Sequence, residues 1–257
     1  MEYIELEIKE RIGTITLNRP NKRNALNFEL VSELKEAFTS FERDESVKVI
    51  VLKAKGTAFC AGADLAYLQK LQGFSYEENL LDSKHLKELF LTIYTLKKVV
   101  VAQVQGNAIA GGCGLSSVCD FAFTVPEAMF GYTEVKLGFI PAIVMVFLLR
   151  KIGAGNASHL LLSGELISAD EACRMGMVNK VVPSEKLEEA VLTFTKKLLV
   201  ENSSQAMSTT KQMIAKVQSM QMEEALNFAA EMNARARSSD DCQKGIRAFL
   251  DKQKLTW

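Results

Sequence analysis

The residues that most often mark metal sites are scarce in this chain. Its 257 residues include only two histidines, His85 and His159, which lie far apart and lack the spacing of metal ligands. We therefore predict no metal site. The five cysteines form no CxxC pair and are odd in number, which favours a reducing compartment over a disulfide-stabilised secreted scaffold.

Net charge and long apolar runs are also absent. The 31 basic residues balance the 31 acidic ones, so no overall field favours nucleic acid or an anionic membrane as a partner. The longest apolar run, Leu137–Leu149, contains Pro141 and is shorter than the ~20 residues that cross a bilayer. The segment MEYIELEIKE lacks the basic start and apolar core of a signal peptide. We expect a cytoplasmic protein.

Common fingerprints of nucleotide chemistry are missing as well. Neither G-x-x-x-x-G-K-[ST] nor G-x-G-x-x-G occurs, and no Ser-His-Asp arrangement is evident. No fixed-period repeat or low-complexity linker divides the chain. The length suits one large domain, or one domain with a helical extension.

Periodicity indicates an α/β fold. Strand patterns alternate with glycine-containing turns and helical patterns, an order typical of covered, largely parallel sheets. The segments before and after the turn at Lys9–Gly13 are expected to form a hairpin. The predicted strands are Tyr3–Ile8, Ile12–Leu17, Val47–Leu52, Val99–Val104 and Phe121–Val125.

Helical patterns become dominant from about Pro141 onward. Before that point, Phe28–Phe41 places apolar residues on one helical face, at Leu30, Val31, Leu34, Ala37, Phe38 and Phe41. Ser168 with Glu171 has the form of a capping box. The further helices predicted are Leu65–Leu71, Ala142–Lys151, Asn156–Ser163, Ser168–Met175, Ser184–Val200, Ser204–Ser219 and Met222–Ser238.

The most informative segment is Val101–Asp120, VAQVQGNAIAGGCGLSSVCD. It sets a glycine-rich turn between an apolar β-branched strand and the start of a helix. Backbone N–H groups left free in such a turn attract negative charge, so the same arrangement suits a developing oxyanion. A second glycine turn, TAFCAGAD at Thr57–Asp64, brings a second set of donors.

Five motifs in order give the chain a resemblance to the enoyl-CoA hydratase/isomerase, or crotonase, superfamily. They are NRPNKRNALN, FCAGADL, GNAIAGGCGLSSVCDF, FGYTEVKLGFIP and SGELISADEACRMGMVNKVVP. The resemblance implies an α/β fold with a spiral core of repeated ββα turns, residues 1–195, that binds acyl-CoA. It further implies a helical trimerisation region, residues 196–257, and homotrimers that commonly pair into hexamers. Coenzyme A would be part of the substrate, with no separate cofactor.

The resemblance also implies roles for particular residues. The backbone N–H groups of Ala63 and Gly111 would form the oxyanion hole for the thioester carbonyl, and Glu134 would move a proton on or off the α-carbon. Glu134 lies among apolar neighbours, and such surroundings tend to raise a carboxyl pKa. The substrate-binding positions implied are Arg23, Ala25, Ala61, Asp64, Leu65, Ile109, Gly114 and Tyr132. For Tyr132 we expect a packing role, with holding the attacking water as the alternative.

One departure from the family pattern bears on the reaction. The first glutamate of the two-glutamate hydratases aligns with Gly114, which has no side chain. The segment EVKLGFIPAIVMVF is similar to a bacterial group that resembles methylglutaconyl-CoA hydratases, so we predict a hydratase of that kind. A distal substrate carboxylate would need a cation, for which Lys136 and Lys70 are candidates.

Several alternatives to this hydratase remain open. They are a double-bond isomerase with Glu134 as sole acid and base, a glutaconyl-thioester decarboxylase, and a non-catalytic CoA-thioester-binding or RNA-associated protein. The acyl group, the reaction direction and the pathway do not follow from these residues.

Overall fold

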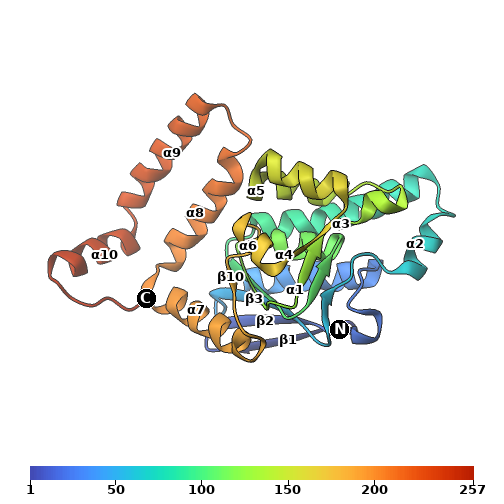
Figure 1. Cartoon of the computed structure of the whole chain (residues 1–257). Coiled ribbons are helices and arrows are strands. Elements are labelled where there is room, and N and C mark those ends of the chain that lie inside the picture. Colours follow the sequence, from blue (N-terminus) through green and yellow to red (C-terminus); the bar gives the residue numbers. More distant parts are fainter.

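The computed structural model describes all residues, 1–257, and shows two β-sheets with helices packed around them (Figure 1). The predicted α/β class is confirmed. The larger sheet has the strand order β1-β2-β3-β5-β7-β10 and the smaller has β4-β6-β8-β9. Their bounds are β1 (Ile4–Lys9), β2 (Ile12–Leu17), β3 (Val49–Ala54), β4 (Ala58–Cys60), β5 (Val99–Val104), β6 (Asn107–Ile109), β7 (Phe121–Thr124), β8 (Met129–Gly131), β9 (Leu166–Ser168) and β10 (Lys180–Val181).

A ββα unit repeats through the middle of the chain. Strands β3 and β4 lie in different sheets and lead into α2 (Leu65–Leu71) and α3 (Tyr76–Thr95). Likewise, β5 and β6 lead into α4 (Gly111–Ser117), and β7 and β8 lead through the short turn η2 (Glu134–Leu137) into α5 (Ala142–Ser163). Because β4, β6 and β8 are parallel neighbours, the loops after them meet at one edge of the smaller sheet.

The first elements form as predicted. Strands β1 and β2 pair antiparallel, with Ile4 opposite Leu17 and Lys9 opposite Ile12. Helix α1 (Phe28–Arg43) buries the six apolar residues that its periodicity assigned to the core. Its N-terminus is capped by Asn27, whose side chain accepts a hydrogen bond from the Leu30 N–H at 3.0 Å.

The later part of the chain follows the predicted helices with local differences. The two segments predicted within 142–163 are the halves of α5, which is interrupted at Gly153 with φ 74° and ψ 164°. Ser168 caps α6 (Ala169–Arg174) by accepting from the Glu171 N–H at 3.2 Å. Helix α7 (Leu187–Glu201) packs on β3, β5 and β7 and passes through the predicted boundary at 195/196.

Two helices and several short strands were not predicted. Helix α3 is rich in charged residues and buries only Leu89, Phe90 and Ile93, so it lacks a continuous apolar stripe. Helix α10 (Asp240–Leu250) buries none of its residues. Strands β4, β6, β8 and β9 have three residues each, too few for a periodic signal.

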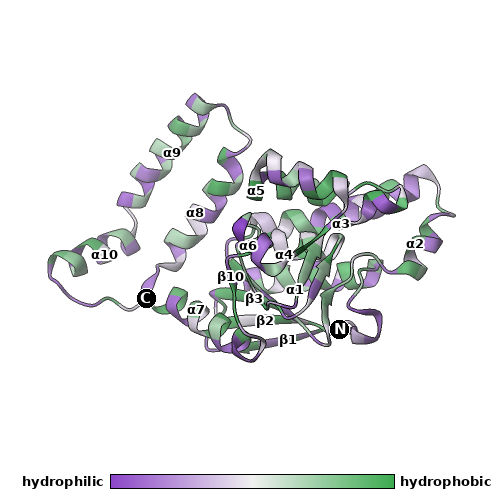
Figure 2. Cartoon of the chain, in the orientation of Figure 1, coloured by the Kyte–Doolittle hydropathy of each residue, from purple (hydrophilic) through white to green (hydrophobic).

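The C-terminal helices α8 (Ser204–Val217), α9 (Met222–Arg237) and α10 extend to one side of the core as an arm (Figure 1). Apolar segments recur along this arm, on helices that stand away from the sheets (Figure 2). No helix of the chain combines the length and the apolar character needed to cross a bilayer.

Candidate functional site

The two glycine turns found in the sequence lie against each other. A side-chain Cβ added at Gly62 would lie 2.9 Å from the Ala110 Cβ and 3.8 Å from the Gly111 nitrogen. Gly62 has no side chain, so it adopts φ +90° without steric cost and lets the two loops approach each other. Ala110 precedes α4 with φ 51°, a conformation uncommon for a residue with a side chain. The fold therefore brings the loops after β4 and β6 into direct contact.

Two backbone donors at this contact have no acceptor in the protein. The neighbouring groups are all engaged: Leu26 N donates to Gly62 O at 2.7 Å, Asp64 N to Leu26 O at 2.8 Å, and Ala110 N to Gly131 O at 2.7 Å. The N–H groups of Ala63 and Gly111 donate to nothing. Ala63 is exposed and Gly111 opens α4, so both donors are open to a bound group.

Glu134 is held near these donors by the end of β8. Strand β8 pairs with β6 through Ile109 and Gly131, and Glu134 begins the η2 turn three residues later. Its side chain is part-buried, and its Oε2 atom is buried without a hydrogen-bond partner. Burial raises the pKa of this carboxyl, while a hydrogen bond from its own backbone opposes the shift. Burying a carboxylate oxygen without a partner lowers the stability of the folded protein. Such an oxygen is suited to accept a proton from a ligand.

Position 114, which the resemblance aligns with the first glutamate of two-glutamate hydratases, is closed by packing. Gly114 lies one turn into α4, and a Cβ there would lie 2.3 Å from Val144 Cγ1 and 3.0 Å from Phe90 Cε1. Val144 and Phe90 are buried core residues. No larger residue fits at position 114 without a change in α5, so Glu134 is the acidic side chain that remains at this place.

The segment containing Arg23 and Ala25 runs beside the glycine turn at Thr57–Asp64. Ala61 N donates to Arg23 O at 3.0 Å, and Leu26 bridges to Ala63 in parallel. Arg23 is exposed with φ 49°, whereas Ala25 is buried. Arg23, Ala25, Ala61 and Ala63 therefore lie together, as their predicted contact with one substrate requires.

Asp64 faces inward rather than toward this segment's open side. Its Oδ1 accepts from the N–H groups of Ala66 at 2.9 Å and Tyr67 at 3.3 Å, capping α2. Its Oδ2 lies 2.9 Å from the Arg19 guanidinium, which also donates to Ala25 O at 2.8 Å. Although burial alone would raise it, these hydrogen bonds and the Arg19 charge leave the pKa of Asp64 lowered. The carboxylate thus holds the turn in place, while Leu65 beside it is 75% exposed.

Tyr132 and Ile109 support the site from within. Tyr132 is fully buried, and its hydroxyl lies 3.2 Å from Ser117 Oγ. This placement favours the packing role over the water-holding role, because the hydroxyl is already bonded inside the core. Ile109 is part-buried in β6 opposite Gly131.

Some of these relationships left no signal in the sequence. Arg19 belongs to the NRP motif, yet its ion pair with Asp64 crosses a long stretch of chain. Val144 and Phe90 meet Gly114 from α5 and α3, elements that no local pattern connects to it. No group of three or more His, Cys, Asp or Glu side chains forms a metal-binding cluster.

The fold also brings a serine and a histidine together. Ser32 Oγ lies 3.0 Å from His85 Nε2, and Lys35 Nζ lies 3.2 Å from His85 Nδ1. A lysine ammonium can only donate, so Nδ1 accepts and Nε2 carries the proton. Ser32 itself donates to Phe28 O at 3.0 Å. The histidine therefore has no free nitrogen with which to activate Ser32 as a nucleophile.

Comparison with known proteins matches nearly the whole chain. Residues 7–257 match the model of the family described as Enoyl-CoA hydratase/isomerase. The chain is 39% identical over 245 residues to a protein of Thermus thermophilus provisionally named an enoyl-CoA hydratase, covering 95% of this chain and 96% of that one. It is 34% identical over 259 residues to the crotonyl-CoA hydratase of Syntrophomonas wolfei, covering 100% and 98%.

A solved structure agrees with these sequence matches. The enoyl-CoA hydratase of Mycobacterium smegmatis superposes with a TM-score of 0.93 at 32% identity, covering 99% of this chain and 98% of that one. The similarity extends through the sheets and the helical arm alike.

Proposed function

The chain belongs to the enoyl-CoA hydratase/isomerase family, with its crotonase-like fold, and we propose that it is an acyl-CoA hydratase. The reaction would add or remove water at the 2,3 position of an enoyl-CoA thioester. One observation carries the proposal: the buried, unpartnered Oε2 of Glu134 lies at the edge of the sheet where two unpaired backbone donors meet. Relatives named crotonyl-CoA hydratase and short-chain-enoyl-CoA hydratase support water addition.

In this proposal the thioester oxygen accepts hydrogen bonds from the Ala63 and Gly111 N–H groups. When water attacks C3, the electrons of the double bond move toward the thioester and form an enolate. Donors that are already fixed in place stabilise that charge without reorganising, and one such donor contributes about 3 kcal/mol. Arg19 neutralises Asp64 beside Ala63, so no uncompensated carboxylate opposes the enolate.

A single carboxylate suffices for the proton balance. Ionised Glu134 accepts a proton from the attacking water as the C3–O bond forms. It then donates that proton to C2 as the enolate collapses, which regenerates the carboxylate. Such general acid–base catalysis typically contributes ~10²–10⁴ in rate. The closed position at Gly114 supports this one-residue scheme, because no second acid can stand there without repacking.

A carboxylated enoyl thioester, such as methylglutaconyl-CoA, is the substrate we propose. Lys136 lies in the same η2 turn as Glu134, is exposed, and has no carboxylate partner within 4.0 Å. Lys70 stands farther along α2, with its ammonium 6.0 Å from the Phe74 ring centroid. We therefore assign the distal carboxylate to Lys136. Coenzyme A enters as part of the substrate, and we place the enzyme in the cytoplasm, a reducing setting that suits its five free cysteines.

Double-bond isomerisation is the second candidate. It too needs only one carboxylate, which would carry a proton between C2 and C4 of the acyl chain. The absence of a side chain at Gly114 is compatible with isomerisation and with hydration, because both schemes use only Glu134. Product mass separates the two, since hydration adds one water and isomerisation leaves the mass unchanged.

The test is incubation of the purified enzyme with crotonyl-CoA, a 3-enoyl-CoA and 3-methylglutaconyl-CoA, followed by mass spectrometry of the products. Glu134→Gln should lose ~10²–10⁴ in kcat with little change in KM. Lys136→Met should raise KM for 3-methylglutaconyl-CoA but not for crotonyl-CoA. Full activity of Glu134→Gln would refute its catalytic role. Rearrangement of the 3-enoyl-CoA without hydration of either other thioester would establish the isomerase. Release of CO₂ would instead indicate a decarboxylase, and tight thioester binding without turnover a binding protein.

A further inference from the structure

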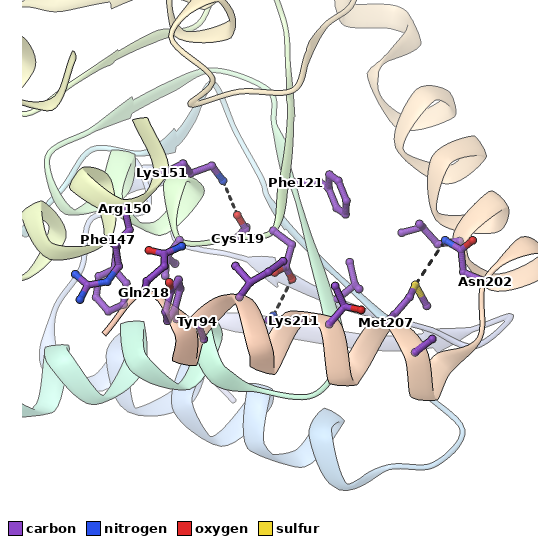
Figure 3. Close-up of a pocket in the computed structure, with 18 of the residues that line it drawn as sticks. Tyr94, Cys119, Phe121, Phe147, Arg150, Lys151, Asn202, Met207, Lys211 and Gln218 are labelled. Carbon is purple, nitrogen blue, oxygen red and sulfur yellow. Dashed lines mark hydrogen bonds and ion pairs between the residues drawn. The ribbon is translucent and has the colours of Figure 1, made fainter. Parts of the chain in front are cut away.

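A cavity of about 750 Å³ lies between α8 and the core, separate from the site described above (Figure 3). Its walls come from α8, from the ends of α3, α4 and α7, from α5, and from the final residue, Trp257. The volume is in the range of small-molecule sites. Ala63, Gly111 and Glu134 are not among its lining residues.

Hydrogen-bond donors that the protein leaves available gather at one end of this cavity. Arg150, Tyr94 and Gln218 lie together there, beside Phe147 (Figure 3). The Tyr94 hydroxyl is buried and has no hydrogen-bond partner. The only bond that the Arg150 guanidinium makes is to Val146 O, at 2.9 Å in its own helix. Arg150 is exposed, so its other donors are hydrated and stay available to a ligand.

Lys151 adds a second cation to the wall. Its Nζ donates to Cys119 O at 2.6 Å, which leaves two of its three N–H donors free. Neither Lys151 nor Arg150 has a carboxylate within 4.0 Å. Burial lowers the pKa of Lys151, although the nearby Asp120 carboxylate opposes the shift.

The acidic groups of the cavity are already paired. Asp120 Oδ2 accepts from Lys211 Nζ and from Val100 N, each at 2.7 Å. Glu201, which also lines the cavity, lies 3.7 Å from Lys197. The remaining charge is therefore positive and sits at the end where Tyr94 lies.

The other end carries apolar side chains together with the polar residues Glu201, Asn202 and Ser203. Phe121 and Met207 lie toward the start of α8, far from Arg150 (Figure 3). Leu198 and Trp257 also line the cavity. The 14 residues of α8 span roughly 20 Å, so the cavity has room for an alkyl chain between its two ends.

We propose that this cavity binds a medium-chain alkyl carboxylate. The carboxylate would accept hydrogen bonds from Arg150, Lys151 and the Tyr94 hydroxyl, and the chain would lie along α8 toward Phe121 and Met207. Such a ligand is a free acid without coenzyme A, so the site is distinct from the one proposed for the thioester.

Trp257 provides the readout, because it is the one tryptophan of the chain and lines the cavity. Decanoate, titrated below its micelle concentration into the full-length protein, should change Trp257 fluorescence saturably. Decanol, which has the same chain without the charge, should bind much more weakly. Arg150→Gln and Lys151→Met should each weaken decanoate binding by roughly tenfold or more, the scale of a hydrogen bond to a charged group.

Matched control variants test whether a loss of decanoate binding comes from the cavity itself. Lys186→Met, which removes an exposed lysine outside the cavity, should bind decanoate like the wild type, and Lys151→Arg should retain most of the affinity. Glu134→Gln should also bind normally, so failure of the catalytic proposal would not affect this one. Circular dichroism of each variant confirms folding.

Three results would overturn the proposal. They are the absence of a saturable change, equal binding of decanol, and variants of Arg150 and Lys151 that bind decanoate like the wild type. A fluorescence that depends on protein concentration and not on decanoate would show that a second copy of the chain covers the cavity instead.

Discussion

Glu134 combines a catalytic assignment with a cost to the fold. Its buried carboxylate oxygen has no partner, and burial raises its pKa above the ordinary carboxyl value. Because hydration begins with the ionised form, kcat/KM should fall as the pH is lowered through this raised pKa. A pH–rate profile with crotonyl-CoA, compared between the wild type and Glu134→Asp, measures the pH at which kcat/KM falls. A profile flat down to the ordinary carboxyl range would contradict the assignment.

The same group predicts a stability effect of defined sign. A carboxyl whose pKa is higher in the folded than in the unfolded protein stabilises the fold at low pH, and this stabilisation is lost as the pH rises through the folded-state value. Glu134→Gln has no charge to desolvate. It should therefore unfold at a higher temperature than the wild type above that pH, where each 1 kcal/mol of stability corresponds to about 2–4 °C. Calorimetry at acidic and neutral pH should show the difference only at neutral pH.

Gly114 is the second residue with a testable role. Gly114→Glu should destabilise the protein by about 1–3 kcal/mol or more, because its Cβ would lie 2.3 Å from Val144 Cγ1. Adding Val144→Ala should recover part of that loss, as measured by urea unfolding. Gly155→Glu is a matched control, since nothing lies within 4 Å of the position where its Cβ would be. Equal losses at positions 114 and 155 would show that the packing contact is unimportant.

At the scale of elements, docking of α8 depends on a charged contact. Lys211 Nζ bonds to Asp120 at 2.7 Å and to Lys98 O at 2.9 Å, and Lys211 is buried. Asp120 keeps 24% of its side chain exposed, so the full cost of breaking a buried pair does not apply.

Lys211→Met should destabilise the protein by about 1–3 kcal/mol. Amide hydrogen exchange should accelerate in α8 more than in β3 or β5. The exposed pair of Lys197 and Glu201 gives the control, because Lys197→Met should change stability by less than about 1 kcal/mol. Uniform acceleration throughout the molecule would mean that α8 does not open as a separate unit.

The elements also show what sequence reasoning captures. The periodicity of α1 and the alternation of β1 and β2 are local, and both predictions are confirmed. The sequence did not predict helix α3 because its buried residues are confined to its last turns. The sequence did not predict the smaller sheet because its three-residue strands are defined by pairing between distant segments of the chain.

For the candidate site, too, sequence reasoning captured some features and missed others. Family motifs marked Ala63, Gly111 and Glu134, and the fold places all three around the same sheet edge, while their catalytic roles stay predictions. Asp64 was expected to face the substrate but is bonded inward, and Tyr132 is bonded inward in keeping with the packing role. Their orientation depends on Arg19 and Ser117, partners that only the folded chain supplies.

At the scale of the whole molecule, apolar side chains are exposed on the surface of the C-terminal arm. The arm leaves large apolar side chains in water, including Met222 at 76%, Leu226 at 62% and Phe249 at 82% exposure. Apolar patches of this kind mark association surfaces. We therefore expect the arms to pack against other copies, in the trimer or hexamer predicted from the family resemblance.

Phe249→Lys together with Leu226→Lys should lower the mass measured by light scattering toward that of one chain, while far-ultraviolet circular dichroism stays unchanged. Leu81→Lys, which charges an exposed leucine of α3 outside the arm, should leave the mass unaltered. A wild type that is already monomeric at high concentration would contradict the expectation.

Val144 also restricts the order in which descendants of this chain can change. A lineage that acquires a second carboxylate at position 114 must first shorten the residue at 144, since the reverse order passes through a poorly folded ancestor. The first of these steps brings no catalytic advantage and would have to spread by drift. A contact between two core atoms can thus preserve one form of chemistry over long evolutionary times.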